Sequence, residues 1–239
     1  MTDTKALKIK WLGHSCFEFR SPTGKVILVD PFLSGNPSLS KELRVINEVD
    51  IIAITHGHSD HVGDTMSIYE SLRPKVVAPF ELILLLQSRG IATNDSVGMN
   101  IGGEINIKNI KISMTPAMHS SSYIDSDMIL SAGLACGYVF TFEDGRRVYH
   151  AGDTWLFSEM EFIRLIWKPE IVMLPIGGHY TMDVRAVRLA VEMLSPKYVI
   201  PMHYDTFPEI SAVPQALKSD LYAMGVELIV PSIGQSLVL

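Results

Sequence analysis

The stretch Thr55-His56-Gly57-His58-Ser59-Asp60-His61 decides the fold, because it gathers three imidazoles and a carboxylate within six residues. It follows a largely apolar run at residues 49–54, which predicts a strand buried on both faces. His56 and His58 are two positions apart, so in an extended segment they point to the same side. Asp60 and His61 stand at the start of a predicted helix and point elsewhere. Two diverging pairs of side chains predict two metal ions.

The ligand types indicate which metals such a site takes. Neutral imidazoles and carboxylates suit zinc, manganese or iron. One loop cannot fill two coordination shells, so further ligands are expected at other strand ends. His119, Asp153 and His203 each lie one to four residues past a predicted strand. If those strands share a sheet edge, the three side chains converge there, where binding loops commonly lie.

The order of these motifs resembles that of the metallo-β-lactamase fold over essentially the whole chain: HxHxDH, a downstream histidine, Gly152-Asp153-Thr154 and a last histidine. Further segments resemble a family of predicted metal-dependent hydrolases. That family is similar to the ascorbate-phosphate lactonase and to the phospholipase D that acts on N-acylethanolamine phospholipids. The segments are Trp11-Leu12-Gly13-His14-Ser15, Val29-Asp30-Pro31, residues 175–183 and Pro201-Met202-His203-Tyr204.

The resemblance implies a ligand set for two divalent ions, with zinc expected first and manganese as the alternative. In that set His56, His58 and His119 hold one ion, Asp60, His61 and His203 hold the other, and Asp153 bridges them. The ions would stand about 3.5–4 Å apart and generate a hydroxide that attacks a carbonyl or phosphorus. Asp60 therefore counts both as a ligand and as a catalytic residue.

Several residues beside the predicted ligands are candidates for supporting roles. The position of His179 resembles that of a proton-donating histidine in related phosphodiesterases, so we expect a general acid or a contact to a substrate phosphate. Support of a ligand or a purely structural role remain the alternatives. His14 and Asp30 are expected to contact ligands or substrate, and Asp30 suits a carboxylate that orients a ligand histidine. Tyr180 and Tyr204 are expected to line the pocket.

Three other reactive side chains are expected to be structural. His150 lies inside a predicted strand and is expected to be a core histidine. Cys16 and Cys136 are far apart and form no CxxC motif, so we expect buried thiols rather than a disulfide framework.

The hydropathy pattern predicts strands that are followed, in each half of the chain, by helices and further strands. The loops 31–47 and 120–131 are expected to cover the substrate. The predicted helices span 62–72, 80–89, 156–166, 184–194 and 213–224. The predicted strands span 7–12, 16–19, 26–29, 49–54, 76–78, 105–107, 110–115, 134–142, 147–150, 171–174, 198–200, 226–229 and 236–239.

This pattern predicts an α/β protein, and the resemblance implies an αββα four-layer sandwich of two packed mixed sheets with helices outside. Residues 1–239 contain no Ser/Gly linker and no low-complexity segment, so we expect a single domain.

The amino-acid composition indicates which kinds of partner the protein has. Hydrophobic residues make up 47% of the chain and charged residues 19%, which excludes intrinsic disorder and suggests a surface covered in a homo-oligomer. The net charge of −6 weighs against nucleic acid. No signal peptide and no membrane span is recognised, which predicts a cytoplasmic protein.

We therefore expect a hydrolase in which a dinuclear metal site activates a hydroxide against a small ester, lactone or phosphoester. A nuclease or phosphodiesterase acting on nucleic acid is the alternative, because the same metals suit it. A non-catalytic metal-binding module is a third possibility, against which the complete set of seven predicted ligands argues.

Overall fold

The computed structural model describes residues 6–239, which form two compact units. The first unit takes the described residues up to Asn100, together with Ser120–Ala135 and Ser232–Leu239. The second unit takes Ile101–His119 and Cys136–Pro231. Within this described part of the chain, no helix is long and apolar enough to cross a membrane.

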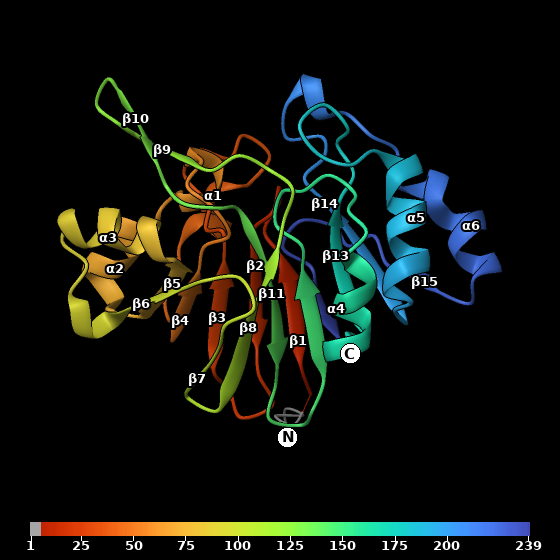
Figure 1. The fold of residues 1–239 in the computed structure, drawn as a ribbon, viewed down its shortest axis with the longest axis horizontal. Helices are drawn as coiled ribbons and strands as arrows, with labels where there is room; N and C mark the ends of the chain where they lie inside the picture. The colour runs from red at the N-terminus through yellow and green to blue at the C-terminus, as the bar shows by residue number, and fades with distance from the viewer. Residues whose placement is uncertain (1–5) are drawn as a thin grey trace. The chain divides into compact units, whose positions relative to one another are not determined.

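The first unit contains a seven-stranded mixed sheet in the order β16-β1-β2-β3-β4-β5-β6 (Figure 1). Strands β3 to β6 run parallel to one another, and β16, β1, β2 and β3 pair antiparallel. Every residue of β3 and β4 is buried, as expected for parallel strands covered on both faces. The strands are β1 (Lys8–Trp11), β2 (Phe17–Arg20), β3 (Val26–Val29), β4 (Ile51–Ala53), β5 (Lys75–Pro79), β6 (Ser96–Met99) and β16 (Ser236–Val238).

The single helix predicted over 62–72 is wrong, because the chain breaks at Gly63. Helix α1 (Ser59–Val62) ends there, and α2 (Thr65–Leu72) starts two residues later. Gly63 has a φ of 44°, and a Cβ at this position would lie 2.2 Å from the Pro31 carbonyl oxygen. Only glycine fits so close to that backbone, so a tertiary contact overrides the helical pattern.

The remaining helices of the first unit are α3 (Phe80–Ser88) and the 3-10 turns η1 (Lys41–Arg44) and η2 (Thr93–Asp95). The expected helix over 80–89 is confirmed to within one residue. Side chains of α2 and α3, including Tyr69 and Leu82, pack with Ile52 of β4 and Val76 of β5 into one apolar core. This core packs the two helices against the parallel strands.

The expected loop 120–131 is instead a hairpin of β9 (Ser122–Asp125) and β10 (Met128–Ser131). Its two-residue turn contains Ser126 at a φ of 56°. Asp125 forms an ion pair with Arg89, next to the end of α3. Figure 1 shows the hairpin, in green, extending away from the sheet of its unit. Its polar composition concealed the strand alternation.

The second unit contains a seven-stranded mixed sheet in the order β15-β14-β13-β12-β11-β8-β7. Strands β12 to β15 are parallel, and the others pair antiparallel. The strands are β7 (Glu104–Ile107), β8 (Ile110–Pro116), β11 (Cys136–Thr141), β12 (Arg147–His150), β13 (Ile171–Pro175), β14 (Tyr198–Met202) and β15 (Glu227–Leu228).

Two predicted helices of the second unit needed correction, and one is confirmed. Helix α4 (Met160–Trp167) begins four residues later than expected. The region 213–224 divides into the 3-10 turn η4 (Pro214–Leu217) and α6 (Lys218–Ala223), with η3 (Pro208–Ile210) before them. Helix α5 (Val184–Leu194) has its predicted bounds. Helices α4 and α5 contact each other.

Helix α5 has a defined start because Asp183 caps it. The Asp183 Oδ1 atom accepts the Ala186 N–H at 2.9 Å. Burial raises the pKa of Asp183, but the hydrogen bonds from the Ala186 N–H and from Arg185 outweigh it and lower the pKa below its usual value. A carboxylate at this position also favours the positive end of the helix dipole.

We expect Asp183→Ala to destabilise the protein by about 1 kcal/mol, because the cap is lost. For a chain of this size, that lowers the melting temperature by about 2–4 °C. Asp183→Asn keeps an acceptor and should cost less. Because the folded pKa is depressed, the charge-dependent stabilisation is present above the unfolded-state pKa and lost as pH falls through the folded pKa, below about pH 4. Thermal melts from pH 3 to 7 would refute this if wild type and Asp183→Asn lost stability in parallel.

Candidate metal centre

The histidine-rich loop of the first unit starts where β4 ends and runs into α1. His56 and His61 are fully buried, while His58 is half-buried. The His56 Nε2 and His58 Nδ1 atoms are 2.9 Å apart, and the two rings meet edge to face. Two nitrogens that bind one tetrahedral zinc at about 2.1 Å are themselves about 3.3 Å apart. The spacing of this pair is therefore close to that of two ligands on one ion.

A buried carboxylate holds this loop from behind. Asp30 follows β3 and is fully buried. Its Oδ1 accepts the Thr55 N–H at 2.8 Å, and its Oδ2 accepts the Thr55 hydroxyl and His61 Nδ1–H, both at 2.7 Å. A buried carboxylate is costly unless hydrogen bonds satisfy it, and these three donors do so. Asp30 thus joins the ends of two neighbouring parallel strands.

These hydrogen bonds fix the tautomers of two histidines. A carboxylate only accepts, so His61 Nδ1 carries the proton and the neutral ring presents a lone pair at Nε2. The single Thr55 hydroxyl proton goes to Asp30, so at 3.0 Å this oxygen accepts from His56 Nδ1–H. His56 therefore also presents Nε2. Both rings are oriented as metal-binding histidines commonly are. Sequence reasoning missed the role of Thr55, whose one signal was its place beside His56.

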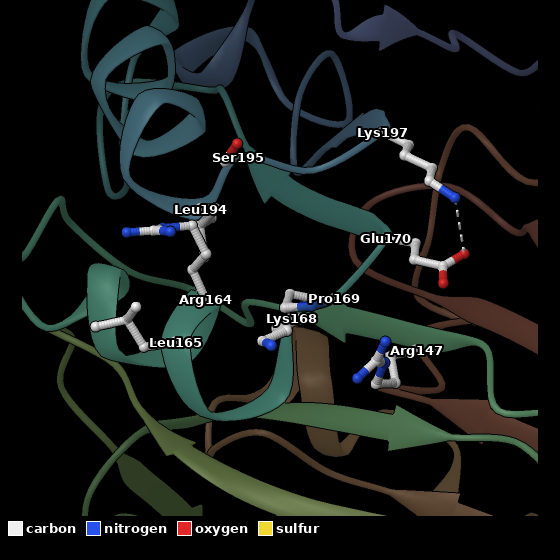
Figure 2. Close-up of a pocket in the computed structure, with 9 residues that line it drawn as sticks. All are labelled: Arg147, Arg164, Leu165, Lys168, Pro169, Glu170, Leu194, Ser195 and Lys197. Carbon is white, nitrogen blue, oxygen red and sulfur yellow. Dashed lines mark ion pairs between the residues drawn. The ribbon is translucent and has the colours of Figure 1, made fainter.

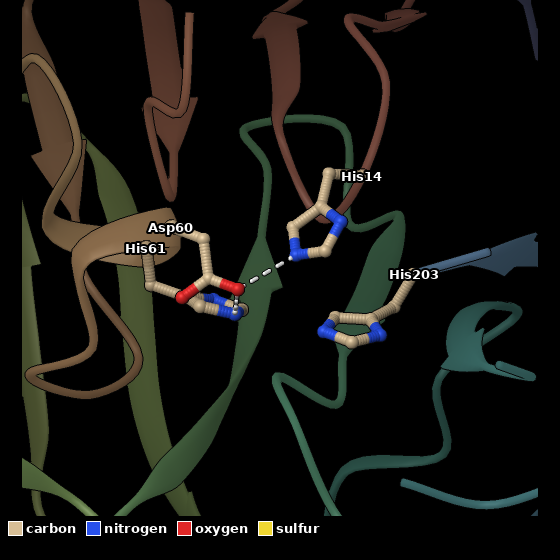
Figure 3. A group of neighbouring side chains, drawn as sticks. All are labelled: His14, Asp60, His61 and His203. Carbon is tan, nitrogen blue, oxygen red and sulfur yellow. Dashed lines mark hydrogen bonds and ion pairs between the residues drawn. The ribbon is translucent and has the colours of Figure 1, made fainter. Parts of the chain in front are cut away.

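His14 and Asp60 form a second group in this unit, shown with His61 in Figure 3. The His14 Nε2 atom lies 3.1 Å from Asp60 Oδ2, and His61 Nε2 lies 4.0 Å from the same oxygen. One donor atom from each of the three residues falls within 4.8 Å of the others. His14 is buried, whereas the Asp60 side chain is partly open to solvent. The predicted proximity of His14 to a candidate ligand is thus observed.

The β9–β10 hairpin is attached to the histidine loop by its base. The Ser121 hydroxyl accepts the Gly57 N–H at 3.2 Å and donates to the Ala132 carbonyl at 3.3 Å. A Cβ on Gly57 would lie 2.5 Å from the Ala132 Cβ and 2.7 Å from the Ser122 carbonyl oxygen. Glycine between the two histidines therefore permits this close approach. Ser121 is a second positioning residue that the sequence did not reveal.

In the second unit, three predicted ligands come together. The Asp153 Oδ2 atom lies 3.0 Å from His203 Nε2 and 3.6 Å from His119 Nε2. Asp153 and His203 are buried, and the His119 side chain is 12% exposed. The three residues follow β12, β14 and β8 respectively. One carboxylate between two imidazoles, at distances near those of ligands sharing an ion, is an arrangement that suits a divalent metal.

Thr154 links three loops around this group. Its hydroxyl accepts the Met118 N–H at 2.9 Å and donates to the Trp155 carbonyl at 2.6 Å. Its carbonyl accepts the Met182 N–H at 3.1 Å. The segment before His119 and the segment after the His179 loop are therefore both tied to the turn that carries Asp153. The sequence showed Thr154 only as part of a motif.

The other candidates of this unit differ in exposure. His179 is exposed, and its ring meets that of exposed Tyr180 edge to face at 4.4 Å. Tyr204 is buried, and burial raises its pKa to about 12. His150 is fully buried, and its Nδ1 accepts the Gly152 N–H, which confirms a core histidine. Cys16 and Cys136 are buried free thiols, as expected.

Three residues of this set are among the ten described non-glycine residues that have a positive φ. His14, Asp30 and His203 have φ values of 53°, 46° and 54°, in the left-handed region that non-glycine residues rarely adopt. Such conformations cost about 1–3 kcal/mol each and occur preferentially at functional sites. The donor set of imidazoles and carboxylates in both units fits zinc or manganese.

Comparison with known proteins agrees with this chemistry. A family model described as a beta-lactamase superfamily domain matches residues 8–203. A metal-dependent hydrolase of Koribacter versatilis is 44% identical over 216 residues, covering 90% of this chain and 92% of that protein. A relative of the same description from Methanocaldococcus jannaschii is 42% identical over 230 residues, covering 96% of this chain and 99% of that protein.

A solved structure points to the same class. A metallo hydrolase from Ignicoccus hospitalis has a TM-score of 0.86 and 36% identity, with 98% of each chain covered. The expected metallo-β-lactamase fold, with two mixed sheets and helices, is thereby confirmed, and the protein is a metal-dependent hydrolase. Within the β-lactamase superfamily, the chain belongs to the UPF0173 metal-dependent hydrolases.

We expect Asp30→Asn to weaken metal binding about 10–100-fold. The amide that replaces one carboxylate oxygen donates rather than accepts, which favours the His61 tautomer with its proton on Nε2. Asp64→Asn is the matched control, because Asp64 accepts the Leu33 and Ser34 N–H groups at 2.9 Å. Titration with zinc against a chromophoric chelator measures the effect. Equal affinities for the two variants would contradict it.

Proposed function

We propose that this hydrolase binds two divalent metal ions, with zinc as the first expectation and manganese as the second. The observation that carries the proposal is the Asp153 carboxylate between His119 and His203, which suits a ligand shared by two ions. The oriented Nε2 atoms of His56 and His61 give independent support. The proposed ligands are His56, His58, Asp60, His61, His119, Asp153 and His203.

Bound in this way, the ions would lower the pKa of a water molecule and polarise the oxygen of the bond to be cleaved. The protein's own residues prepare the site for that chemistry. Asp30 and Thr55 hold two imidazoles in the tautomer that presents Nε2. Asp60 supplies a partly exposed carboxylate beside His14, which would leave it open to substrate as well as to an ion.

We propose a small ester, lactone or phosphoester as the substrate. A cavity of about 170 Å³ beside the histidine loop has room for part of such a molecule. It is lined by Gly57 and Ser59 of that loop and by Tyr123 and Ile124 of the hairpin. Such a mixed lining holds a short apolar group beside the polar loop. In this proposal the hairpin covers the substrate, which is the role expected of residues 120–131.

His179 is the proposed proton donor. Its exposed imidazole follows two glycines, and no other element buries it. A histidine ring nitrogen can hold a proton and deliver it to the leaving oxygen. Its contact with Tyr180 restricts the ring orientation.

The exposed apolar residues of α4 support a homo-oligomer. Phe162, Leu165 and Ile166 are all at least half exposed and lie at helical spacing on one face. Light scattering of the purified protein tests this: a single-chain mass at all concentrations would contradict it.

Metal removal tests the main proposal. We expect purified protein to contain about two equivalents of zinc or manganese and to hydrolyse a panel of lactones, carboxyl esters and phosphodiesters. Chelation should abolish turnover, and re-addition should restore it. Asp153→Asn should lower metal content and reduce kcat at least about 100-fold, since removal of even an outer partner costs 10–100-fold. Asp220→Asn, exposed on α6, is the control. Fewer than one equivalent after reconstitution would overturn the dinuclear site.

His179→Gln separates proton donation from metal binding. We expect kcat to fall about 10²- to 10⁴-fold with unchanged metal content, because the ions do not depend on this side chain. The loss should be smallest for substrates with a good leaving group. Arg188→Gln, which removes an exposed pair with Glu192, is the control. Equal losses for good and poor leaving groups would argue for a structural role.

A further inference from the structure

A second cavity, of about 370 Å³, lies wholly within the second unit (Figure 2). It opens beside the amino ends of the parallel strands β12, β13 and β14, where Arg147, Glu170 and Lys197 stand. Helices α4 and α5 both end at it, at Lys168 and Ser195. Asp153 and His203 follow the opposite, carboxyl ends of β12 and β14, so this cavity is separate from the candidate metal ligands.

The lining of the cavity is strongly cationic. It contains four basic side chains and a single carboxylate, that of Glu170. The pair between Lys197 Nζ and Glu170 Oε2 is loose, at 3.8 Å, and Lys197 is mostly exposed. The basic residues are Arg147, Arg164, Lys168 and Lys197.

Among the described residues, Arg164 is the member of this cationic group whose side chain forms hydrogen bonds. Arg164 donates from Nε to the Met193 carbonyl at 3.0 Å and from one terminal nitrogen to Glu161 at 2.9 Å. It thereby neutralises the negative end of α5. The structural demand for positive charge at the two helix ends is thus met largely by Arg164.

The Arg147 and Lys168 side chains make no comparable contacts among the described residues. The Arg147 Nε atom is buried and, among the described residues, has no hydrogen-bond partner. Lys168 is exposed and forms no ion pair within residues 6–239. Unpaired cationic side chains around a cavity that holds a single carboxylate are a place where an anion would be stabilised.

We propose that this cavity binds the phosphate group of a small phosphorylated molecule. The planar guanidinium of Arg147 matches two phosphate oxygens, and lysines supply point charges around them. The volume is in the lower part of the range typical for small-molecule sites. The phosphate would replace Glu170 as the partner of the Lys197 ammonium group. The concave shape and the nearby carboxylate favour a small molecule over a nucleic-acid strand.

Binding to the metal-loaded protein tests the proposal. Calorimetry and thermal shift are measured with inorganic phosphate, pyrophosphate and ribose 5-phosphate, against sodium chloride at equal ionic strength. Saturable binding of any of the three is expected, and preference for ribose 5-phosphate over inorganic phosphate would identify an organic phosphate. The double variant Arg147→Gln/Lys168→Gln should bind at least tenfold more weakly. Lys218→Gln, an exposed lysine of α6, is the control and should bind as wild type.

Three outcomes would overturn the proposal. The first is no binding at 10 mM ligand, and the second is equal binding by the double variant and wild type. The third is binding that Asp153→Asn abolishes and the double variant leaves unchanged, which would assign the phosphate to the metal ions. If Arg147→Gln does not fold, Lys168→Glu reverses an exposed charge and should abolish binding alone. Tighter binding of a single-stranded oligonucleotide than of pyrophosphate would replace the small molecule with nucleic acid.

Discussion

The carboxylate of Asp30 is the constraint on which the histidine loop depends. It lies fully buried at the end of β3 and takes hydrogen bonds from the Thr55 backbone, the Thr55 hydroxyl and His61. Because β3 and β4 are parallel neighbours, with Val29 opposite Ala53, both strands deliver these groups to the same edge. Removing any donor would leave a buried charge incompletely satisfied. The loop conformation and two histidine tautomers therefore depend on one side chain.

Packing of the hydrophobic core offsets the conformational strain of these residues. His14, Asp30 and His203 all have left-handed backbone conformations that a non-glycine residue adopts only when the surroundings enforce them. In the first unit, buried β-strands and the apolar faces of α2 and α3 provide the enforcement. Loosely packed strand ends would relax the strain and release the imidazoles from their positions. Rigid strands are thus a requirement of the site as well as of the fold.

Patterns local in the sequence were predictable, whereas tertiary hydrogen bonds were not. The periodicity predicted α5 with its bounds, and the histidine spacing predicted that candidate ligands would follow strand ends. It did not predict the break at Gly63, because the Pro31 carbonyl that forces it lies 32 positions away. Nor did these patterns predict the positioning roles of Thr55 and Ser121. Their hydroxyls form hydrogen bonds with Asp30 and with the Gly57 N–H, which lie elsewhere in the chain. Ordinary polar residues become identifiable only when their neighbours are known.

In the second unit, strand β12 runs from the cationic cavity toward the candidate metal ligand Asp153. Arg147 begins it, and Asp153 follows it six residues later, at most about 20 Å away in an extended chain. At this full separation, two charges interact by about 0.2 kcal/mol in water and by about 0.8 kcal/mol at the effective dielectric constant of about 20 that applies to protein sites. Physiological salt screens the part of this interaction that passes through solvent. The strand also offers a mechanical connection between its two ends, because its last three residues are fully buried.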